Sequence, residues 1–152
     1  ATYGVGAAKL ARETGMSKKE AQKLLDAFWS RNWSVQKVAS TLRKRELFGG
    51  MWVQNPVSKF WHSLRSEKDR FSTLNQSTGV YCFDVWVKKC RDKDVKIVGQ
   101  FHDEIIALVK EGKQIETAIN MNYSIEEVNR QLRLNVDLGI DAQFGKTYAD
   151  IH

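Results

Sequence analysis

Proline, cysteine and long apolar runs are all scarce in this sequence. Pro56 is the only proline, and no repeat, low-complexity tract or flexible linker interrupts the chain. The two cysteines, Cys82 and Cys90, lie eight residues apart in a helical pattern. That spacing is about 12 Å along a helix, which is too far for a disulfide. We therefore expect free thiols in a reducing cytosol, and no zinc site can be assembled from them.

Signals for membrane insertion and for secretion are also lacking. No apolar run approaches the roughly 20 residues that are needed to span a bilayer. The first four residues form neither the basic nor the apolar region of a signal peptide. Both features predict a cytoplasmic protein that does not enter a membrane.

Acidic residues are scarce in the first half of the chain. Residues 1–70 hold 14 Lys and Arg against 6 Asp and Glu, a net charge of +8. Residues 71–152 hold 10 against 12, a net charge of −2. A basic half favours a polyanionic partner, most simply nucleic acid, and a solvated basic surface is the alternative. The overall composition, 42% hydrophobic and 28% charged, is that of a globular protein. At 152 residues the chain can bury one core, alone or with a small appendage.

The spacing of apolar residues and helix caps predicts a mixed α+β fold. Ser17 and Glu20 form a capping box that opens a helix, and Gly49-Gly50 interrupts the helical pattern. The expected helices cover residues 7–12, 18–32, 34–47, 66–93 and 112–133. The expected strands cover residues 51–54, 59–64, 95–101, 105–109 and 135–143. We expect the last three strands to form one antiparallel sheet with helices on one face.

The long helix expected over residues 66–93 has two unusual features. Its apolar positions are dense, so we expect it to be largely buried, and Gly79 inside it indicates either a loss of stability or a close contact. It also carries the polar run Asn75-Gln76-Ser77-Thr78, and short polar side chains compete with the helix backbone. The run is either an exposed polar face or a face that contacts a nucleic-acid minor groove.

The sequence Gln100-Phe101-His102-Asp103-Glu104 separates two apolar runs and predicts the tip of a β-hairpin. A tip carboxylate between two strands is held firmly and suits a divalent metal, and a polar turn is the alternative. Nucleotidyl transfer uses two metal ions, which require at least two carboxylates. Asp103 supplies one of them, and no acidic residue elsewhere has a comparable setting. The chain is therefore chemically incomplete for that reaction.

Four motifs follow one another along the chain, at residues 1–11, 70–79, 98–106 and 145–152. They contain, in order, a Tyr-Gly pair, the run Gln-Ser-Thr-Gly, the run Gln-x-His-Asp-Glu, and a tail with an aromatic residue and a terminal His. Together they resemble the fingers and palm of family A DNA polymerases, the group of bacterial DNA polymerase I and many phage replicases. The resemblance covers nearly the whole chain and is weak across residues 32–66.

The resemblance implies roles for individual residues. Asp103 binds the catalytic Mg²⁺ ions, Glu104 supports it beside them, and His102 approaches the primer terminus. Gln76 contacts the minor-groove edge of the primer–template DNA. Further candidates for contact with the duplex are Arg70, Lys68, Ser72 and the terminal His152. Tyr3 belongs to the fingers that close over the incoming deoxynucleoside triphosphate. For Tyr3 a packed aromatic side chain is the alternative, and for His152 a frayed terminus.

The family pattern also implies a division of the chain and a missing part. Residues 1–48 correspond to a helical portion of the fingers, and residues 49–152 to the palm. The family's other catalytic Asp and the Arg and Lys that hold the triphosphate have no counterpart here, and the chain begins inside a fingers motif. We therefore expect the carboxy-terminal part of a split polymerase, phage-like and acting in the host cytoplasm. A separate amino-terminal chain completes its two-metal site.

Two other classes of protein remain open. A non-catalytic DNA-binding module derived from a palm predicts salt-dependent duplex binding without metal dependence. A small metal hydrolase built on the residues His102, Asp103 and Glu104 needs more ligands, and His62 and His152 lack a supporting spacing. Exposure of apolar surface separates these classes, because a half-palm without its partner leaves an apolar face uncovered.

Overall fold

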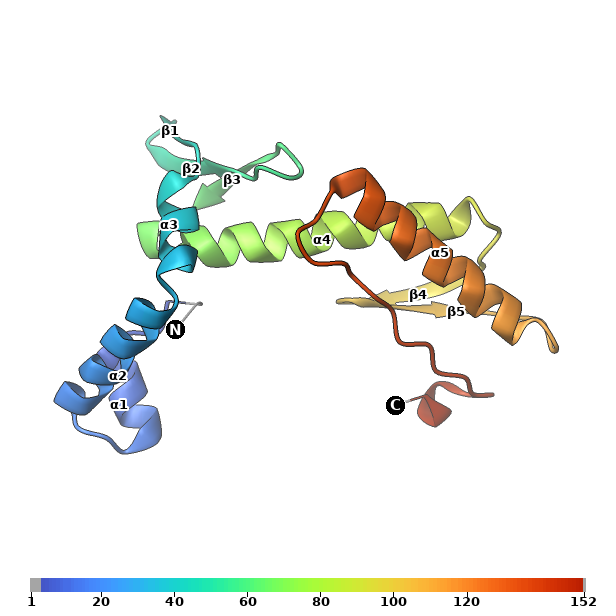
Figure 1. The fold of residues 1–152 in the computed structure, drawn as a ribbon, viewed down its shortest axis with the longest axis horizontal. Coiled ribbons are helices and arrows are strands. Elements are labelled where there is room, and N and C mark those ends of the chain that lie inside the picture. Colours follow the sequence, from blue (N-terminus) through green and yellow to red (C-terminus); the bar gives the residue numbers. More distant parts are fainter. Residues whose placement is uncertain (1–3, 152) are drawn as a thin grey trace. The chain divides into compact units, whose positions relative to one another are not determined.

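The computed structural model describes residues 4–151 and divides the chain into two compact units (Figure 1). Unit 1 extends to Thr78, and unit 2 begins at Gly79. The division falls inside the longest helix, α4 (Arg70–Arg91), whereas the family resemblance divides the chain at residues 48 and 49. The expected α+β class is confirmed, since helices accompany two small antiparallel sheets.

Unit 1 opens with three helices, α1 (Ala7–Thr14), α2 (Lys18–Arg31) and α3 (Trp33–Thr41). The predicted capping box opens α2: the Glu20 N–H donates to the Ser17 hydroxyl, and the Ser17 N–H donates to the Glu20 carboxylate at 2.9 Å. Ala21 and Leu25 of α2 are buried with Ala7 of α1. This small apolar cluster holds the first two helices together.

A three-stranded antiparallel sheet follows, in the order β1 (Lys44–Leu47), β2 (Gly50–Gln54) and β3 (Trp61–Leu64). Strands were expected over residues 51–54 and 59–64, and β2 and β3 form there and pair antiparallel across the loop that contains Pro56. The prediction of a helix over residues 34–47 is wrong, because α3 ends at Thr41 and the chain becomes extended at Leu42. Leu47 pairs with Gly50, so Phe48 and Gly49 make the turn from β1 into β2. Both have positive φ, the backbone of a tight hairpin turn.

The core beneath this sheet also explains why β1 forms. Leu42 is buried with Val53 and Leu64, and Leu74 of α4 packs against them. A helix through residue 47 would not pair with β2. The extended chain therefore gains both a buried leucine and the β1–β2 ladder. A short 3-10 helix, η1 (Glu67–Asp69), leads from β3 into α4.

Unit 2 contains the remainder of α4, the hairpin of β4 (Ile97–Phe101) and β5 (Glu104–Ala107), and the single helix α5 (Gln114–Leu132). One cluster of buried residues joins all of them. Its members are Trp86, Val87, Cys90, Val95, Ile125 and Val128. The Trp86 indole N–H also donates to the Met121 carbonyl oxygen at 3.1 Å, which fixes α4 against α5. The predicted hairpin is confirmed, and both cysteines are free and buried.

Two expectations for unit 2 are wrong. Residues 135–144 form no strand, because the Asn129 side chain of α5 holds both backbone groups of Leu138, at 2.8 and 2.9 Å, in place of a neighbouring strand. The sheet therefore has two strands where three were expected. Nor is α4 largely buried: the side chain of Val80 is 59% exposed, and a Cβ at Gly79 would meet no described atom within 4 Å.

Candidate metal-binding and nucleic-acid-binding residues

The candidate metal ligands lie at the turn of the β4–β5 hairpin. Phe101 pairs with Glu104, so His102 and Asp103 alone make the turn, and His102 adopts a positive φ of 49°. The side chains of His102 and Asp103 are exposed, and Glu104 is half-buried. The strands thus present one exposed carboxylate and, next to it, a second one that is partly covered.

These residues do not form a complete metal site by themselves. Within residues 4–151 there is no group of three or more His, Cys, Asp and Glu side chains that could hold a metal ion. Magnesium is often bound through one or two carboxylates together with substrate phosphates. Asp103 and Glu104 fit that partial role. They do not fit a two-metal site within this chain, and the metal hydrolase considered above gains no further ligand.

The tail of the chain lies beside this hairpin. The ring of Tyr148, in the short 3-10 helix η2 (Tyr148–Asp150), has its centroid 6.2 Å from that of Phe101, the residue before the turn. The carboxylate of Asp150 accepts the N–H groups of Thr147 and Lys146, and these hydrogen bonds lower the pKa of Asp150. Two of the four sequence motifs therefore meet within unit 2. The terminal His152 lies outside the described residues.

The polar run of α4 divides into a structural half and an exposed half. The buried Asn55 amide donates to the hydroxyl of Ser77 at 2.7 Å and to that of Thr78 at 2.9 Å. Asn75 and Gln76 are exposed. The exposed Gln76 side chain is therefore accessible to a ligand, whereas the hydroxyls of Ser77 and Thr78 already accept hydrogen bonds from Asn55. Asn55 was not predicted as part of this network, although Asn before Pro is a familiar turn signal.

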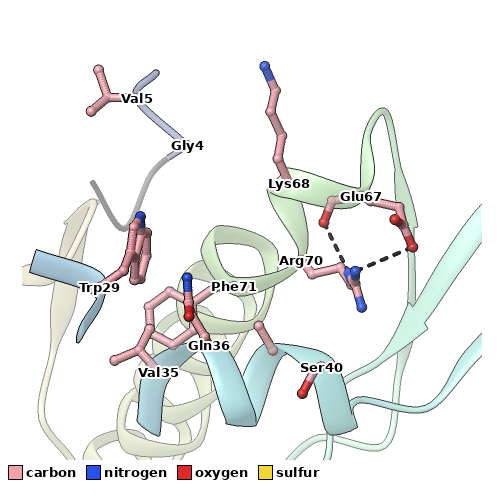
Figure 2. Close-up of a pocket in the computed structure, with 11 residues that line it drawn as sticks. Gly4, Val5, Trp29, Val35, Gln36, Ser40, Glu67, Lys68, Arg70 and Phe71 are labelled. Atoms are coloured by element: carbon pink, nitrogen blue, oxygen red, sulfur yellow. Dashed lines mark hydrogen bonds and ion pairs between the residues drawn. The ribbon is translucent and has the colours of Figure 1, made fainter. Parts of the chain in front are cut away.

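Of the three other candidates for contact with DNA, Lys68 of η1 and Arg70 of α4 line a cleft of about 450 Å³ in unit 1 (Figure 2), and Ser72 lies farther along α4. Arg70 lines the cleft but is bound to Glu67, donating to its carbonyl at 3.0 Å and facing its carboxylate at 3.3 Å. The Ser72 hydroxyl donates to the Asp69 carbonyl. Figure 2 shows the Lys68 side chain directed away from the Arg70–Glu67 pair.

Of the two charged candidates, Arg70 is paired with Glu67, whereas the Lys68 ammonium takes part in no ion pair within the described part of the chain. The cleft is lined by residues from four segments. They are Gly4 and Val5; Trp29 of α2; Val35, Gln36, Ala39 and Ser40 of α3; and Glu67, Lys68, Arg70 and Phe71 around the start of α4. Tyr3, the candidate from the fingers motif, lies outside the described residues.

A second basic feature of unit 1 was missed because β1 was expected to be helical. Arg43 and Arg45 flank Lys44 at the start of β1, and both guanidinium groups lie over tryptophan rings of the neighbouring strands. In a strand, residues two apart lie on the same face, so Arg43 and Arg45 share a face of the sheet. A helix over these residues would not place them together.

Comparison with known proteins adds no family. Neither the protein-family models nor the curated proteins yielded a match to this chain.

Proposed function

We propose that this chain is the carboxy-terminal fingers-and-palm part of a family A DNA polymerase that acts with a separate amino-terminal chain. One observation carries the proposal: the β4–β5 hairpin presents Asp103 at an exposed two-residue turn, next to Glu104. The tail motif lies beside the same hairpin through Tyr148 and Phe101. The spacing of the four motifs is consistent with this arrangement.

The reaction is template-directed extension of a primer. The primer 3′-hydroxyl attacks the α-phosphorus of a deoxynucleoside triphosphate, a new phosphodiester bond forms, and pyrophosphate leaves. Bound Mg²⁺ activates the hydroxyl and stabilises the leaving oxygens. In this proposal Asp103 and Glu104 contribute carboxylate ligands, His102 approaches the primer end, and Gln76 donates to the minor-groove edge. The partner chain supplies the second catalytic Asp and the groups that hold the triphosphate.

An exposed apolar strip on α5 supports a partner chain. Ile115, Ile119 and Tyr123 are 67%, 48% and 53% exposed and recur every four residues, so they share one side of the helix. With Ile140 they line a shallow cleft of about 470 Å³. Exposed apolar surface of this kind is unfavourable in water and marks an interaction site. Burial of this strip against the other half of the palm would account for its exposure in the separate chain.

The deciding experiment begins with native mass spectrometry of the complex purified through this chain, followed by primer extension with Mg²⁺. Loss of Asp103 removes a metal ligand that is worth several kcal/mol in the transition state, so Asp103→Ala should lower the extension rate about a thousandfold. The complex should still assemble. Asp137→Ala is the matched control, since Asp137 is an exposed carboxylate in the irregular segment after α5.

Two results would count against the proposal. One is extension by the purified chain alone, which lacks the partner's carboxylate. The other is full activity of the Asp103→Ala complex, which would show that the carboxylate at the hairpin turn takes no part in the reaction.

A non-catalytic DNA-binding module is the second candidate function. It is favoured by the net charge of +8 over residues 1–70 and by the arginines of β1, which are exposed. It predicts a chain without a stoichiometric partner that binds duplex DNA in a salt-dependent manner, equally well with and without magnesium.

A further inference from the structure

The outer surface of the β1–β2–β3 sheet is basic and aromatic. Paired residues of an antiparallel sheet share a face, and Arg45 pairs with Trp52 while Gln54 pairs with Trp61. The Gln54 N–H donates to the Arg43 carbonyl, so Arg43 belongs to the same row as Trp61. The opposite face carries Val53 and Leu64 and is buried in the core. We call Arg43, Arg45, Trp52 and Trp61 the arginine–tryptophan face.

The side chains of this face are stacked on one another. The Arg45 guanidinium carbon lies 4.0 Å from the centroid of the Trp61 ring and 5.9 Å from that of Trp52. The Arg43 guanidinium carbon lies 5.6 Å from the Trp61 ring. Tryptophan rings and guanidinium planes therefore alternate across three strands. Stacking of this kind limits the rotamers of both arginines before any ligand arrives.

The positive charge of the face is not neutralised within the protein. Neither Arg43 nor Arg45 forms an ion pair with a carboxylate of residues 4–151. Glu46 of β1 pairs with Met51 and so lies on the opposite, inner face. Both arginines are exposed, and Trp52 and Trp61 are half-buried. Two guanidinium groups are thus held by aromatic rings. One donor of Arg43 is taken by the side-chain oxygen of Gln54, at 3.5 Å. The remaining donors of Arg43 and those of Arg45 are left for a ligand.

We propose that the arginine–tryptophan face binds single-stranded nucleic acid. Arginine recognises phosphate through paired N–H donors, and unpaired bases stack on tryptophan rings and on guanidinium planes. A duplex hides the faces of its bases, whereas a single strand offers them together with its phosphates. The net charge of +8 over residues 1–70 attracts such a polyanion to this unit. This activity needs no metal, no triphosphate and no partner chain, and it is independent of the polymerase proposal.

The test is fluorescence anisotropy of a labelled oligothymidylate of about 20 nucleotides with the full chain, at several salt concentrations between about 50 and 200 mM. The double variant Arg43→Gln/Arg45→Gln should weaken binding at least tenfold. The slope of log affinity against log salt concentration should become shallower by about 0.7 for each lost phosphate contact. The control Arg12→Gln/Arg31→Gln removes two exposed arginines from α1 and α2, with the same change of charge. It should change affinity by less than about threefold.

The aromatic component has its own pair of variants. Trp61→Leu should weaken binding about tenfold, because stacking of one base contributes roughly that factor, and Trp61→Phe should keep most of the affinity because it keeps an aromatic ring. Trp33→Leu is the matched control, since Trp33 is an exposed tryptophan under the cation of Lys37 on α3. Circular dichroism confirms that each variant is folded.

Three outcomes would overturn the inference. Equal losses in the face and control variants would mean that charge alone binds the strand. Duplex DNA bound as tightly as the single strand would exclude stacking on unpaired bases. Polyglutamate bound as tightly as the oligonucleotide would identify a general anion surface.

Discussion

At the scale of single residues, Asn55 is a buried polar side chain whose removal should destabilise unit 1. It is 2% exposed and makes four hydrogen bonds: it donates to Ser77 and Thr78 and accepts the N–H groups of Val57 and Ser58. Asn55→Ala leaves buried polar groups without partners. We expect the free energy of unfolding of unit 1 to fall by about 2–3 kcal/mol.

Urea unfolding followed by tryptophan emission measures this loss, because four of the five tryptophans lie in unit 1. Asn75→Ala on α4 is the matched control. Asn75 is exposed and alanine favours helix, so that variant should be within about 0.5 kcal/mol of the wild-type chain. Equal effects of the two variants would show that the Asn55 network contributes nothing.

Asn55 also marks a limit of sequence analysis at this scale. The run Asn75-Gln76-Ser77-Thr78 is recognisable as costly for a helix, but the side chain that satisfies half of it lies 22 residues earlier. Asp103 at a hairpin turn follows from a local pattern and was predicted. The stack of Arg45 on Trp61 depends on strand register, which the chain does not reveal locally.

At the scale of elements, the same contrast separates correct from wrong predictions. The capping box of α2 and the β4–β5 hairpin are local, and both were predicted. The strand β1 was missed, because Leu42 is buried by residues of β2 and β3. The strand expected over residues 135–143 does not form, because Asn129 binds the backbone of Leu138 from within α5. In both cases the deciding partner lies outside the segment itself, and for Leu138 it is nine residues away.

An ion cluster between α4 and α5 gives the element-scale prediction. Lys93 donates to the Glu127 carboxylate at 2.9 Å and Lys89 at 3.5 Å, and the hydrogen bond from Lys93 is the main cause that lowers the pKa of Glu127. The folded protein therefore holds this proton less tightly than the unfolded chain. The stabilising contribution is complete above the ordinary pKa of 4.5 and is lost as the pH falls through the lowered folded value.

Glu127→Gln should consequently flatten the acid limb of the stability curve. Thermal unfolding by circular dichroism at about pH 7 and pH 3 measures it, and the variant should lose less stability between the two pH values than the wild-type chain. Glu111→Gln, at an exposed carboxylate outside any described ion pair, should keep the wild-type difference. If wild-type chain and Glu127→Gln lost the same stability between the two pH values, the ion cluster would make no contribution to acid unfolding.

At the scale of the whole molecule, charge and core both divide between the two units. Residues 71–78 carry no charge, so unit 1 has the full +8 and unit 2 has −2. The buried residues form separate clusters, two in unit 1 and one in unit 2. The basic unit carries the arginine–tryptophan face, and the acidic unit carries Asp103 and Glu104. The two proposals, single-strand binding and metal ligation, therefore concern different units.

Separate cores predict separate unfolding. Both cysteines belong to unit 2, where burial raises the pKa of Cys82 and of Cys90, so their thiols react only when that unit opens. Thiol labelling in urea therefore reports unit 2, while tryptophan emission reports mainly unit 1. We expect the two midpoints to differ, because different probes coincide only for a single cooperative transition.

Gly79 provides the variant that tests this division. It is the first residue of unit 2 within α4, and an added Cβ there would meet no described atom within 4 Å. Gly79→Ala should strengthen the helix by about 1 kcal/mol at the boundary between the units. Because a stiffer α4 transmits unfolding from one unit to the other, the two midpoints should approach each other in the variant. Coincident midpoints in the wild-type chain would instead mean that the two clusters unfold as one.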